Sequence, residues 1–339
     1  MLKAILSLSG FGLLFGIILS IAYEKLKVEV DERVEEIGEI LPQANCGACG
    51  YPGCSGYAQA VVDGVADLTL CSPGGPEVMK KIAEILGQSV EIPDVKIVTR
   101  ALCGRDLNNH KMKYEYDGIK DCSSAVLLGG GGPLTCTYGC IGLESCMAVC
   151  QFDAISFNEK HLPVVDPEKC TKCMACVKEC PKDLFVLTPS TKKVHVLCSS
   201  KDKGAEVRKY CDVGCIACKL CEKNCAYDAI HVVDNIAIID YEKCVECGVC
   251  VHKCPKNTIV FDGGHEEVRA EIANMELARK HLKAEMCKAK AIIVEEGKDP
   301  EINEKKCNGC LVCFNETPEG TIRMKKYVKP VPVKKVEKG

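Results

Sequence analysis

The stretch that decides the fold lies in the second half of the chain. Residues 215–225 read Cys-Ile-Ala-Cys-Lys-Leu-Cys-Glu-Lys-Asn-Cys, and residues 244–255 read Cys-Val-Glu-Cys-Gly-Val-Cys-Val-His-Lys-Cys-Pro. Two runs of this spacing hold two [4Fe–4S] clusters, because the fourth cysteine of each run binds the cluster of the other run. The runs therefore predict one cluster on Cys215, Cys218, Cys221 and Cys254, and a second on Cys225, Cys244, Cys247 and Cys250. The apolar stretches 229–233 and 237–239 predict short strands between them.

The composition of the whole chain also favours metal binding. The sequence has 28 cysteines among 339 residues, but only 5 % aromatic residues and no tryptophan, so a large aromatic core is not expected. A disulfide framework is the alternative, but such frameworks belong to short secreted chains and rarely repeat a two-residue spacing. Metal-bound thiolates imply a reducing compartment. The net charge of −3 gives no general case for a nucleic-acid partner.

Aligning the sequence with itself reveals an irregular unit upstream. Residues 139–155 match residues 214–230, but Leu143 stands where the middle cysteine of the run belongs. Cys136 lies four residues before Cys140 and is the best substitute. The second half of this unit has the regular spacing. The unit therefore predicts one cluster on Cys136, Cys140, Cys146 and Cys180, and another on Cys150, Cys170, Cys173 and Cys176.

A third unit keeps only half of the pattern. Its run at 307–313 has three regular cysteines, but Thr317 replaces the fourth, and no regular run precedes Cys287. Cys287 shares the Cys-x3-Ala-Ile signature of Cys150 and Cys225. Both losses concern the same missing cluster, so the unit predicts a ferredoxin-like fold that retains one cluster of two. Its ligands would be Cys287, Cys307, Cys310 and Cys313, and four unused thiols near a basic tail are the alternative.

A different cysteine motif lies near the N-terminus. Residues 45–54 read Asn-Cys-Gly-Ala-Cys-Gly-Tyr-Pro-Gly-Cys and are followed by the distant Cys71. Glycines let the backbone approach a cluster closely, and four cysteines are the usual ligands of [4Fe–4S]. We expect a cluster on Cys46, Cys49, Cys54 and Cys71, with zinc as the alternative. Short helices are expected over 31–41, 55–66 and 77–87.

Four cysteines are left over by these assignments, namely Cys103, Cys122, Cys198 and Cys211. Cys103 and Cys198 occupy equivalent positions in two repeats, and Cys211 aligns with Cys136. One interpretation makes the four small buried apolar residues near the clusters. The other makes them ligands of one more metal centre.

The N-terminal segment predicts membrane attachment. Residues 4–23 carry no charge, and about twenty such residues can cross a bilayer as a helix. A signal peptide is the alternative, because Ser20 and Ala22 resemble a cleavage site. Lys25, Lys27 and Arg33 follow the segment, whereas Lys3 precedes it, so the bulk of the chain is expected on the cytoplasmic side.

Other features add little chemistry. The spacing of Cys211, Cys215 and Cys218 occurs in radical-SAM enzymes, but it lies here inside a ferredoxin-type repeat with no barrel-length stretch after it. No Rossmann fingerprint is present, so a nicotinamide site is not expected on this chain. Residues 265–286 suggest a charged helix, and residues 324–339 a solvated basic tail. No catalytic acid, base or nucleophile stands out.

The order of these features resembles the B subunit of the Rnf electron-transport complex. The resemblance rests on an apolar N-terminal segment, the Asn-Cys-Gly-Ala-Cys-Gly-Tyr-Pro-Gly-Cys motif with Cys71, and the tandem ferredoxin repeats. It implies a protein that accepts electrons from reduced ferredoxin and passes them to other Rnf membrane and flavin subunits. The complex would reduce NAD and translocate sodium ions or protons. The motif at 46–54 also resembles corrinoid iron–sulfur proteins, but these need a large barrel that this chain lacks.

The sequence thus predicts an α+β protein that relays electrons through about six [4Fe–4S] clusters and is enzymatic only within its complex. A soluble polyferredoxin that serves a dehydrogenase or hydrogenase is the alternative, and so is a structural zinc protein. The expected parts are a transmembrane anchor and linker (1–30), a small helical 4Fe–4S domain (31–92), two ferredoxin-like βαβ-type repeats with two clusters each (93–190 and 191–264), a helix with a one-cluster repeat (265–323) and the tail (324–339).

Overall fold

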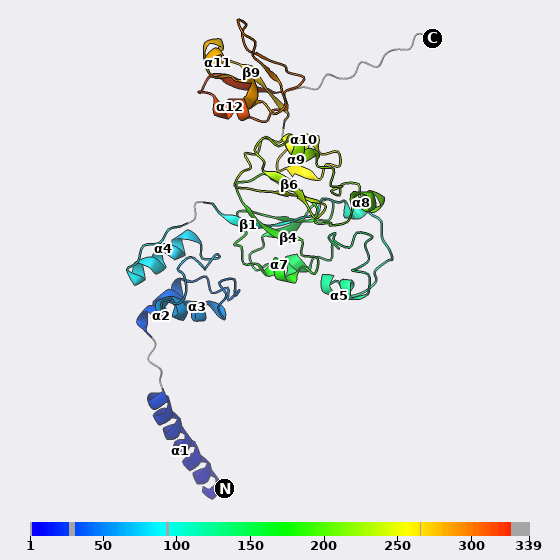
Figure 1. The fold of residues 1–339 in the computed structure, drawn as a ribbon. Helices are drawn as coiled ribbons and strands as arrows, with labels where there is room; N and C mark the ends of the chain where they lie inside the picture. Colours follow the sequence, from blue (N-terminus) through cyan, green and yellow to red (C-terminus); the bar gives the residue numbers. More distant parts are fainter. Residues whose placement is uncertain (1, 27–30, 93–94, 265, 327–339) are drawn as a thin grey trace. The chain divides into compact units, whose positions relative to one another are not determined.

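The computed structural model describes residues 2–26, 31–92, 95–264 and 266–326 (Figure 1). The chain divides into two compact units, Met1–Ile92 and Pro93–Gly339. Part of the expected linker, 27–30, and most of the expected basic tail, 327–339, lie outside the described residues.

All regular secondary structure in the described residues of the first unit is helical. Its elements are α1 (Leu2–Leu26), α2 (Glu32–Ile40), α3 (Gly53–Val62) and α4 (Gly75–Leu86). The Asp31 carboxylate caps α2 by accepting a hydrogen bond from the Arg33 N–H (3.0 Å). Ile37, Tyr57 and Ile82 are fully buried and hold α2, α3 and α4 together. The helices expected over 31–41, 55–66 and 77–87 are therefore confirmed, although their ends lie up to four residues from the predicted ones.

The expected membrane-spanning helix over 4–23 is not supported. Among the residues that the structure describes, no helix has the length and apolar character needed to cross a membrane.

The second unit contains three repeats of one βαββαβ plan. In the first repeat, an outer antiparallel pair joins β1 (Ile97–Ala101) to β4 (Phe185–Pro189), and an inner hairpin joins β2 (Ile155–Phe157) to β3 (Pro163–Val165). A long insertion follows β1. The helical elements are η1 (Leu107–Asn109) and α5 (Cys122–Leu127) in that insertion, then α6 (Ser145–Ala148) and α7 (Ala175–Glu179).

The second repeat has the same order with a shorter insertion. Its outer pair is β5 (Val194–Val196) with β8 (Ile259–Phe261), and its inner hairpin is β6 (Ile230–Val233) with β7 (Ile236–Ile239). The strands expected over 229–233 and 237–239 are thus confirmed. The helices are α8 (Gly204–Tyr210), α9 (Leu220–Asn224) and α10 (Val249–Lys253), of which α9 and α10 pack against each other (Figure 1).

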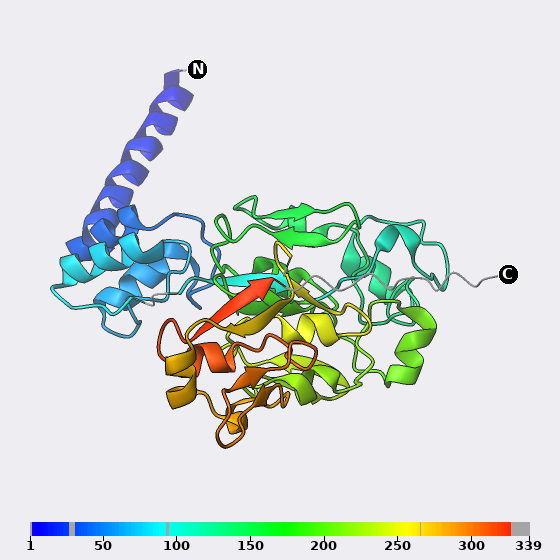
Figure 2. The same ribbon diagram turned by 90° about the horizontal axis from the view of Figure 1, so that it is seen from above.

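The third repeat corrects one prediction. Instead of one charged helix over 265–286, the described part of that range has β9 (Val268–Ile272) before a shorter helix, and β9 pairs with β12 (Ile322–Lys326) and lies beside it in Figure 2. The reason is a period of two, because Val268, Ala270 and Ile272 alternate with charged residues. The remaining elements are α11 (Met275–His281), η2 (Ala284–Met286), β10 (Ile292–Ile293), β11 (Glu301–Ile302) and α12 (Val312–Glu316). The prediction of a mixed α+β protein is confirmed.

Candidate iron–sulfur sites

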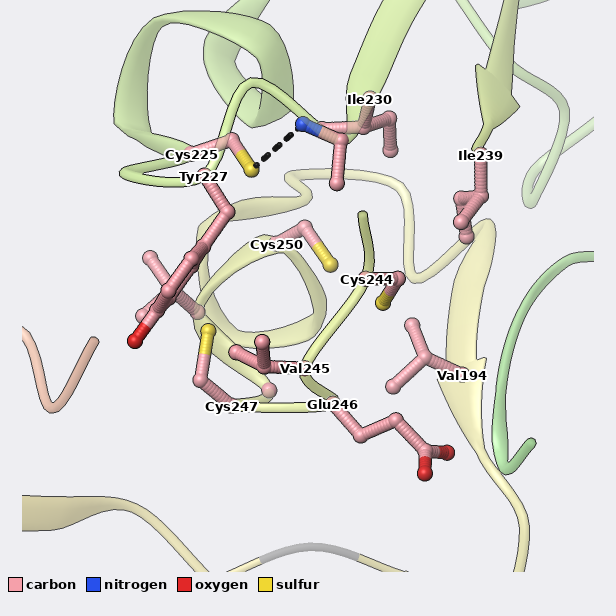
Figure 3. Close-up of a pocket in the computed structure, with 13 residues that line it drawn as sticks. Val194, Cys225, Tyr227, Ile230, Ile239, Cys244, Val245, Glu246, Cys247 and Cys250 are labelled. Atoms are coloured by element: carbon pink, nitrogen blue, oxygen red, sulfur yellow. Dashed lines mark hydrogen bonds between the residues drawn. The ribbon is translucent and has the colours of Figure 1, made fainter. Parts of the chain in front are cut away.

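One cavity in the second repeat shows how the cysteines are arranged (Figure 3). Cys225 follows α9, Cys244 and Cys247 lie on the loop that leads into α10, and Cys250 lies in the first turn of α10. The four side chains surround a common space of about 390 Å³. The apolar part of the wall includes Val194, Val245, Ile230 and Ile239. Such a space, with four thiols around apolar walls, fits the cysteine ligation of a cubane cluster.

Four further cavities in the second unit repeat this arrangement. Each is lined by four cysteines, and this shared lining indicates one kind of occupant; the spaces measure about 310 to 390 Å³. The four sets are Cys215, Cys218, Cys221 and Cys254; Cys150, Cys170, Cys173 and Cys176; Cys287, Cys307, Cys310 and Cys313; and Cys122, Cys140, Cys146 and Cys180.

The backbone explains why the spacing is two residues. In every loop, the residues on both sides of the middle position of the run have positive φ, even where they are not glycine. These pairs are Gly142 and Glu144, Lys172 and Met174, Ala217 and Lys219, Glu246 and Gly248, and Gly309 and Leu311. Left-handed backbone is costly for most side chains and persists where the surroundings require it. The loop around Leu143 keeps this conformation although its middle cysteine is missing.

The Cys-x3-Ala-Ile signature also has a structural cause. The backbone N–H of the alanine donates a hydrogen bond to the sulfur of the cysteine four residues earlier. The distance from N to Sγ is 3.4 Å for Ala154 and Cys150, 3.4 Å for Ala229 and Cys225 (Figure 3), and 3.2 Å for Ala291 and Cys287. Hydrogen bonds to cluster sulfurs are one of the means by which a protein tunes reduction potential.

A hydroxyl group joins one of these sites. Thr99 on β1 is 2 % exposed, and its Oγ1 lies 3.5 Å from the sulfur of Cys176 and 3.7 Å from that of Cys170. The equivalent position on β5 is Val194, which cannot form such a contact. The two otherwise matching sites therefore differ in polarity.

Ten of the cavity thiols have a raised pKa and so resist ionisation while no metal is bound. Burial raises the pKa of Cys146 to about 12, with Cys122 and Cys180 adding to the effect. Burial likewise raises the pKa of Cys313 to about 12. Since thiolates are the ligands, binding of iron must displace these protons.

The first unit brings the N-terminal cysteines together. Cys71 is buried, and burial raises its pKa, to which the neighbouring thiols of Cys54, Cys49 and Cys46 contribute. The loop is held by Asn45, whose Oδ1 accepts a hydrogen bond from the Cys54 N–H (2.8 Å). A side chain at Gly53 would lie 2.8 Å from that same oxygen, so glycine is needed there.

Cys122 is the residue that the spacing argument missed. It begins α5, and its N–H donates to Ser145 Oγ (2.8 Å), whose hydroxyl in turn donates to Asp121 (3.2 Å). This link places Cys122 in the cavity of Cys146, where Cys136 is not among the lining residues. No sequence spacing signals the contact, because the insertion separates the two cysteines. The Cys136 thiol lies instead near Cys103 and Cys211, which both act on its pKa.

The third repeat contacts the second. Val249 of the second repeat and Cys310 and Val312 of the third form one buried cluster. Asn315 Nδ2 donates to the Tyr227 hydroxyl (3.0 Å). At the position of the missing fourth cysteine, the buried Thr317 hydroxyl donates to the Cys313 carbonyl (2.6 Å) and so serves the backbone.

Within the described residues, no group of three or more His, Cys, Asp or Glu side chains is arranged to hold a single metal ion. A cubane distributes its four thiolates over four iron atoms, so the cysteine sets above meet a different geometric requirement.

Three family models match the chain. Residues 41–73 match a putative Fe–S cluster domain, residues 163–185 a 4Fe–4S binding domain and residues 214–275 a 4Fe–4S dicluster domain. These ranges contain the N-terminal motif, the second run of the first repeat and both runs of the second repeat. The predicted [4Fe–4S] chemistry is confirmed at this level.

Relatives are similar over most of their length. The chain is 40 % identical to the B subunit of the ion-translocating oxidoreductase complex of Methanosarcina acetivorans, over 76 % of this chain and 97 % of that protein. It is 42 % identical to the B subunit of the Na(+)-translocating ferredoxin:NAD(+) oxidoreductase complex of Acetobacterium woodii, over 77 % and 79 %. The chain belongs to this family of B subunits. The resemblance to the Rnf complex component is thereby confirmed.

A third member of the family is named for a different ion. The B subunit of the proton-translocating ferredoxin:NAD(+) oxidoreductase complex of Clostridium ljungdahlii is 39 % identical over 73 % of this chain and 88 % of that protein. Among solved structures, a formate dehydrogenase–heterodisulfide reductase–formylmethanofuran dehydrogenase complex from Methanospirillum hungatei matches 56 % of this chain and 79 % of the matched chain, with 18 % identity and a TM-score of 0.23. A score this low carries no argument about the fold.

Proposed function

We propose that this chain is the iron–sulfur electron-relay subunit of an ion-translocating ferredoxin:NAD oxidoreductase complex. The observation that carries the proposal is the recurrence of four cysteines around five cavities of similar size in the second unit. The complex and its reaction are taken from the relatives, which are named as B subunits of ferredoxin:NAD(+) oxidoreductase complexes.

We assign about six [4Fe–4S] clusters to the chain. Five occupy the cavities of the second unit, and Cys122 takes the place first given to Cys136. The sixth is held by Cys46, Cys49, Cys54 and Cys71 in the first unit. Each cluster, when bound, accepts and releases one electron without any bond being made or broken in the chain.

The residues around the cysteines control this exchange. The apolar walls exclude water, which favours a low net charge on the cluster. The N–H groups of Ala154, Ala229 and Ala291 stabilise negative charge on the sulfurs, so they favour the reduced form. The potentials of protein-bound iron–sulfur clusters extend below about −400 mV, a range that suits reduced ferredoxin as the donor.

Electrons would enter through the repeats of the second unit and leave through the N-terminal cluster for the membrane and flavin subunits. NAD reduction would take place on those partners. Membrane attachment would come from α1, where Phe11, Leu13 and Leu19 each expose more than 60 % of their surface and could enter a lipid bilayer.

The order of transfer is tested by Cys46→Ala in the assembled complex. We expect reduced ferredoxin to bleach the clusters of the repeats as in the wild type, while NAD reduction is lost. Ser55→Ala, at an exposed position of the neighbouring helix α3, is the matched control and should leave both reactions intact. Normal NAD reduction by the Cys46→Ala complex would overturn the proposed route.

A further inference from the structure

Four thiols remain once Cys122 is assigned to a cavity. They are Cys103 and Cys136 from the first repeat, and Cys198 and Cys211 from the second. Cys103 and Cys198 each lie two residues beyond the outer strand, β1 or β5, and Cys136 and Cys211 each lie four residues before the first cysteine of a run. The four thiols therefore form two equivalent pairs.

The backbone brings the first members of the two pairs together. The Gly104 N–H donates to the Leu197 carbonyl (3.1 Å), so the residues that follow Cys103 and precede Cys198 are hydrogen-bonded to each other. A Cβ on Gly104 would lie 3.0 Å from the Leu197 side chain. Glycine thus permits a close approach of the two segments that carry these cysteines.

The second members converge on the same place. Burial raises the pKa of Cys136, and the thiols of Cys103 and Cys211 add to the rise. Burial also raises the pKa of Cys198, to about 12, and Cys211 contributes again. A further contact joins the two segments, because the Ser199 hydroxyl donates to the Tyr138 carbonyl (3.2 Å).

Two glycines lie directly against these sulfurs, where a Cβ would also overlap the side chain of Arg105 or Val207. A Cβ on Gly139 would lie 3.5 Å from the Cys136 sulfur, and one on Gly214 would lie 3.3 Å from the Cys211 sulfur. Gly139 and Gly214 are equivalent residues that precede the first cysteine of each run. Both repeats therefore have a residue without a side chain at the equivalent position beside the Cys136 or Cys211 sulfur.

A buried cation beside the group lacks a partner. Arg105 is 5 % exposed, and neither terminal nitrogen of its guanidinium group has a hydrogen-bond partner among the described residues. Its charge acts on the Cys136 thiol, and a Cβ on Gly139 would overlap its Nη2. Burying an unpaired charge is costly, so an anion bound next to Arg105 would stabilise the fold. A cluster bound by four thiolates carries net negative charge.

We propose that Cys103, Cys136, Cys198 and Cys211 bind an additional [4Fe–4S] cluster between the first and second repeats, with Arg105 as its counter-charge. The proposal rests on the proposed function through the assignment of Cys122, which frees Cys136. The cluster would take one electron from a reduced neighbouring cluster and give it to the next, with no change in bonding.

The four thiols lie between a cavity of the first repeat and a cavity of the second, where a cluster could transfer electrons. On one side, Cys103 acts on the pKa of Cys140, which belongs to a cavity of the first repeat. On the other, the Cys198 sulfur accepts a hydrogen bond from the N–H of Cys215 (3.4 Å), which belongs to a cavity of the second repeat. A cluster here would connect the two repeats.

The test uses the full chain, reconstituted anaerobically, with iron, sulfide and zinc counted per chain. We expect about twenty-eight iron atoms in the wild type. Cys103→Ala and Cys198→Ala should each remove about four iron atoms and four sulfides, and the double variant should remove no more than either alone. Wild-type iron in the single variants, additive losses in the double variant, or loss of one zinc in place of iron would each overturn the proposal.

A control keeps this result separate from the proposed function. Cys122→Ala should also lose about four iron atoms, and adding Leu143→Cys should restore them, because the loop at Leu143 already has the backbone conformation of a ligand loop. Failure of Cys122→Ala to lose iron would contradict the assignment of Cys122. Electron transfer between the repeats, followed by rapid mixing with a reductant, should slow in Cys198→Ala and remain fast in Ser55→Ala, whose exposed side chain lies outside the cysteine groups.

Discussion

Thr99 and Val194 show how one side chain can set two equivalent clusters apart. Each lies four residues before a cysteine of the extra group, and each lines a cavity with four cysteines. Only Thr99 offers a hydroxyl group, which lies within 3.7 Å of two sulfurs. When those sulfurs are cluster-bound thiolates, the hydroxyl can donate to one of them and stabilise the reduced state.

Thr99→Val should therefore lower the potential of that cluster. A hydrogen bond worth about 1 kcal/mol corresponds to about 40 mV for one electron, so we expect a shift of that order in a redox titration followed by EPR. Val194→Thr is the reciprocal control and should raise the potential of the matching cluster. Unchanged potentials in both variants would show that the hydroxyl does not interact with the cluster.

Among the elements, the outer strand pair of the third repeat depends on one glycine. Gly309 has a φ of +73° and lies against β9, so a Cβ there would overlap the Val268 carbonyl oxygen. Gly320 has a φ of +81°, but a Cβ there would meet no atom within 4 Å. An alanine would have an unfavourable positive φ at both positions, but only at Gly309 would its Cβ clash with β9.

Gly309→Ala should displace β9 and release the cluster of Cys307, Cys310 and Cys313, with loss of about four iron atoms. Gly320→Ala should keep them and lose only about 1 kcal/mol of stability, the cost of a left-handed alanine. Iron counts and thermal unfolding of both variants measure this. Equal iron loss in the two would mean that strain, and not the clash with β9, decides.

The cysteine loops, β9 and Cys122 show which features could be predicted from the sequence and which could not. The runs of cysteine at a two-residue spacing need a tight left-handed loop, so spacing, with the Cys-x3-Ala-Ile signature for Cys287, indicated four of the five cavity sets. The strand β9 was missed because its charged residues outweighed the alternation of Val268, Ala270 and Ile272. Cys122 was missed because a contact between Asp121 and Ser145, across an insertion, is a tertiary feature with no local pattern.

On the scale of the whole molecule, the cysteine groups of the second unit form a continuous series. Thiols of one group raise the pKa of a thiol in the next group: Cys310 raises that of Cys247, Cys221 that of Cys250, and Cys176 that of Cys146. The extra group supplies the remaining step between the first and second repeats. A relay needs such proximity, and the three βαββαβ repeats provide it by placing each group beside the next.

The last prediction tests the proposal that α1 attaches the chain to a membrane. No described side chain of α1 belongs to the buried core of α2, α3 and α4, so removal of α1 should leave that core intact. A chain without residues 2–26 should therefore retain all of its iron but move to the soluble fraction, whereas the full chain should stay with membranes after a high-salt wash. The double variant Leu13→Lys/Ile17→Lys changes two exposed positions of α1 and keeps the helix in place. It should also release the chain from membranes, because charged side chains are costly in lipid. A full chain that is soluble without its partners would instead support a soluble polyferredoxin, and α1 would then have to bind protein.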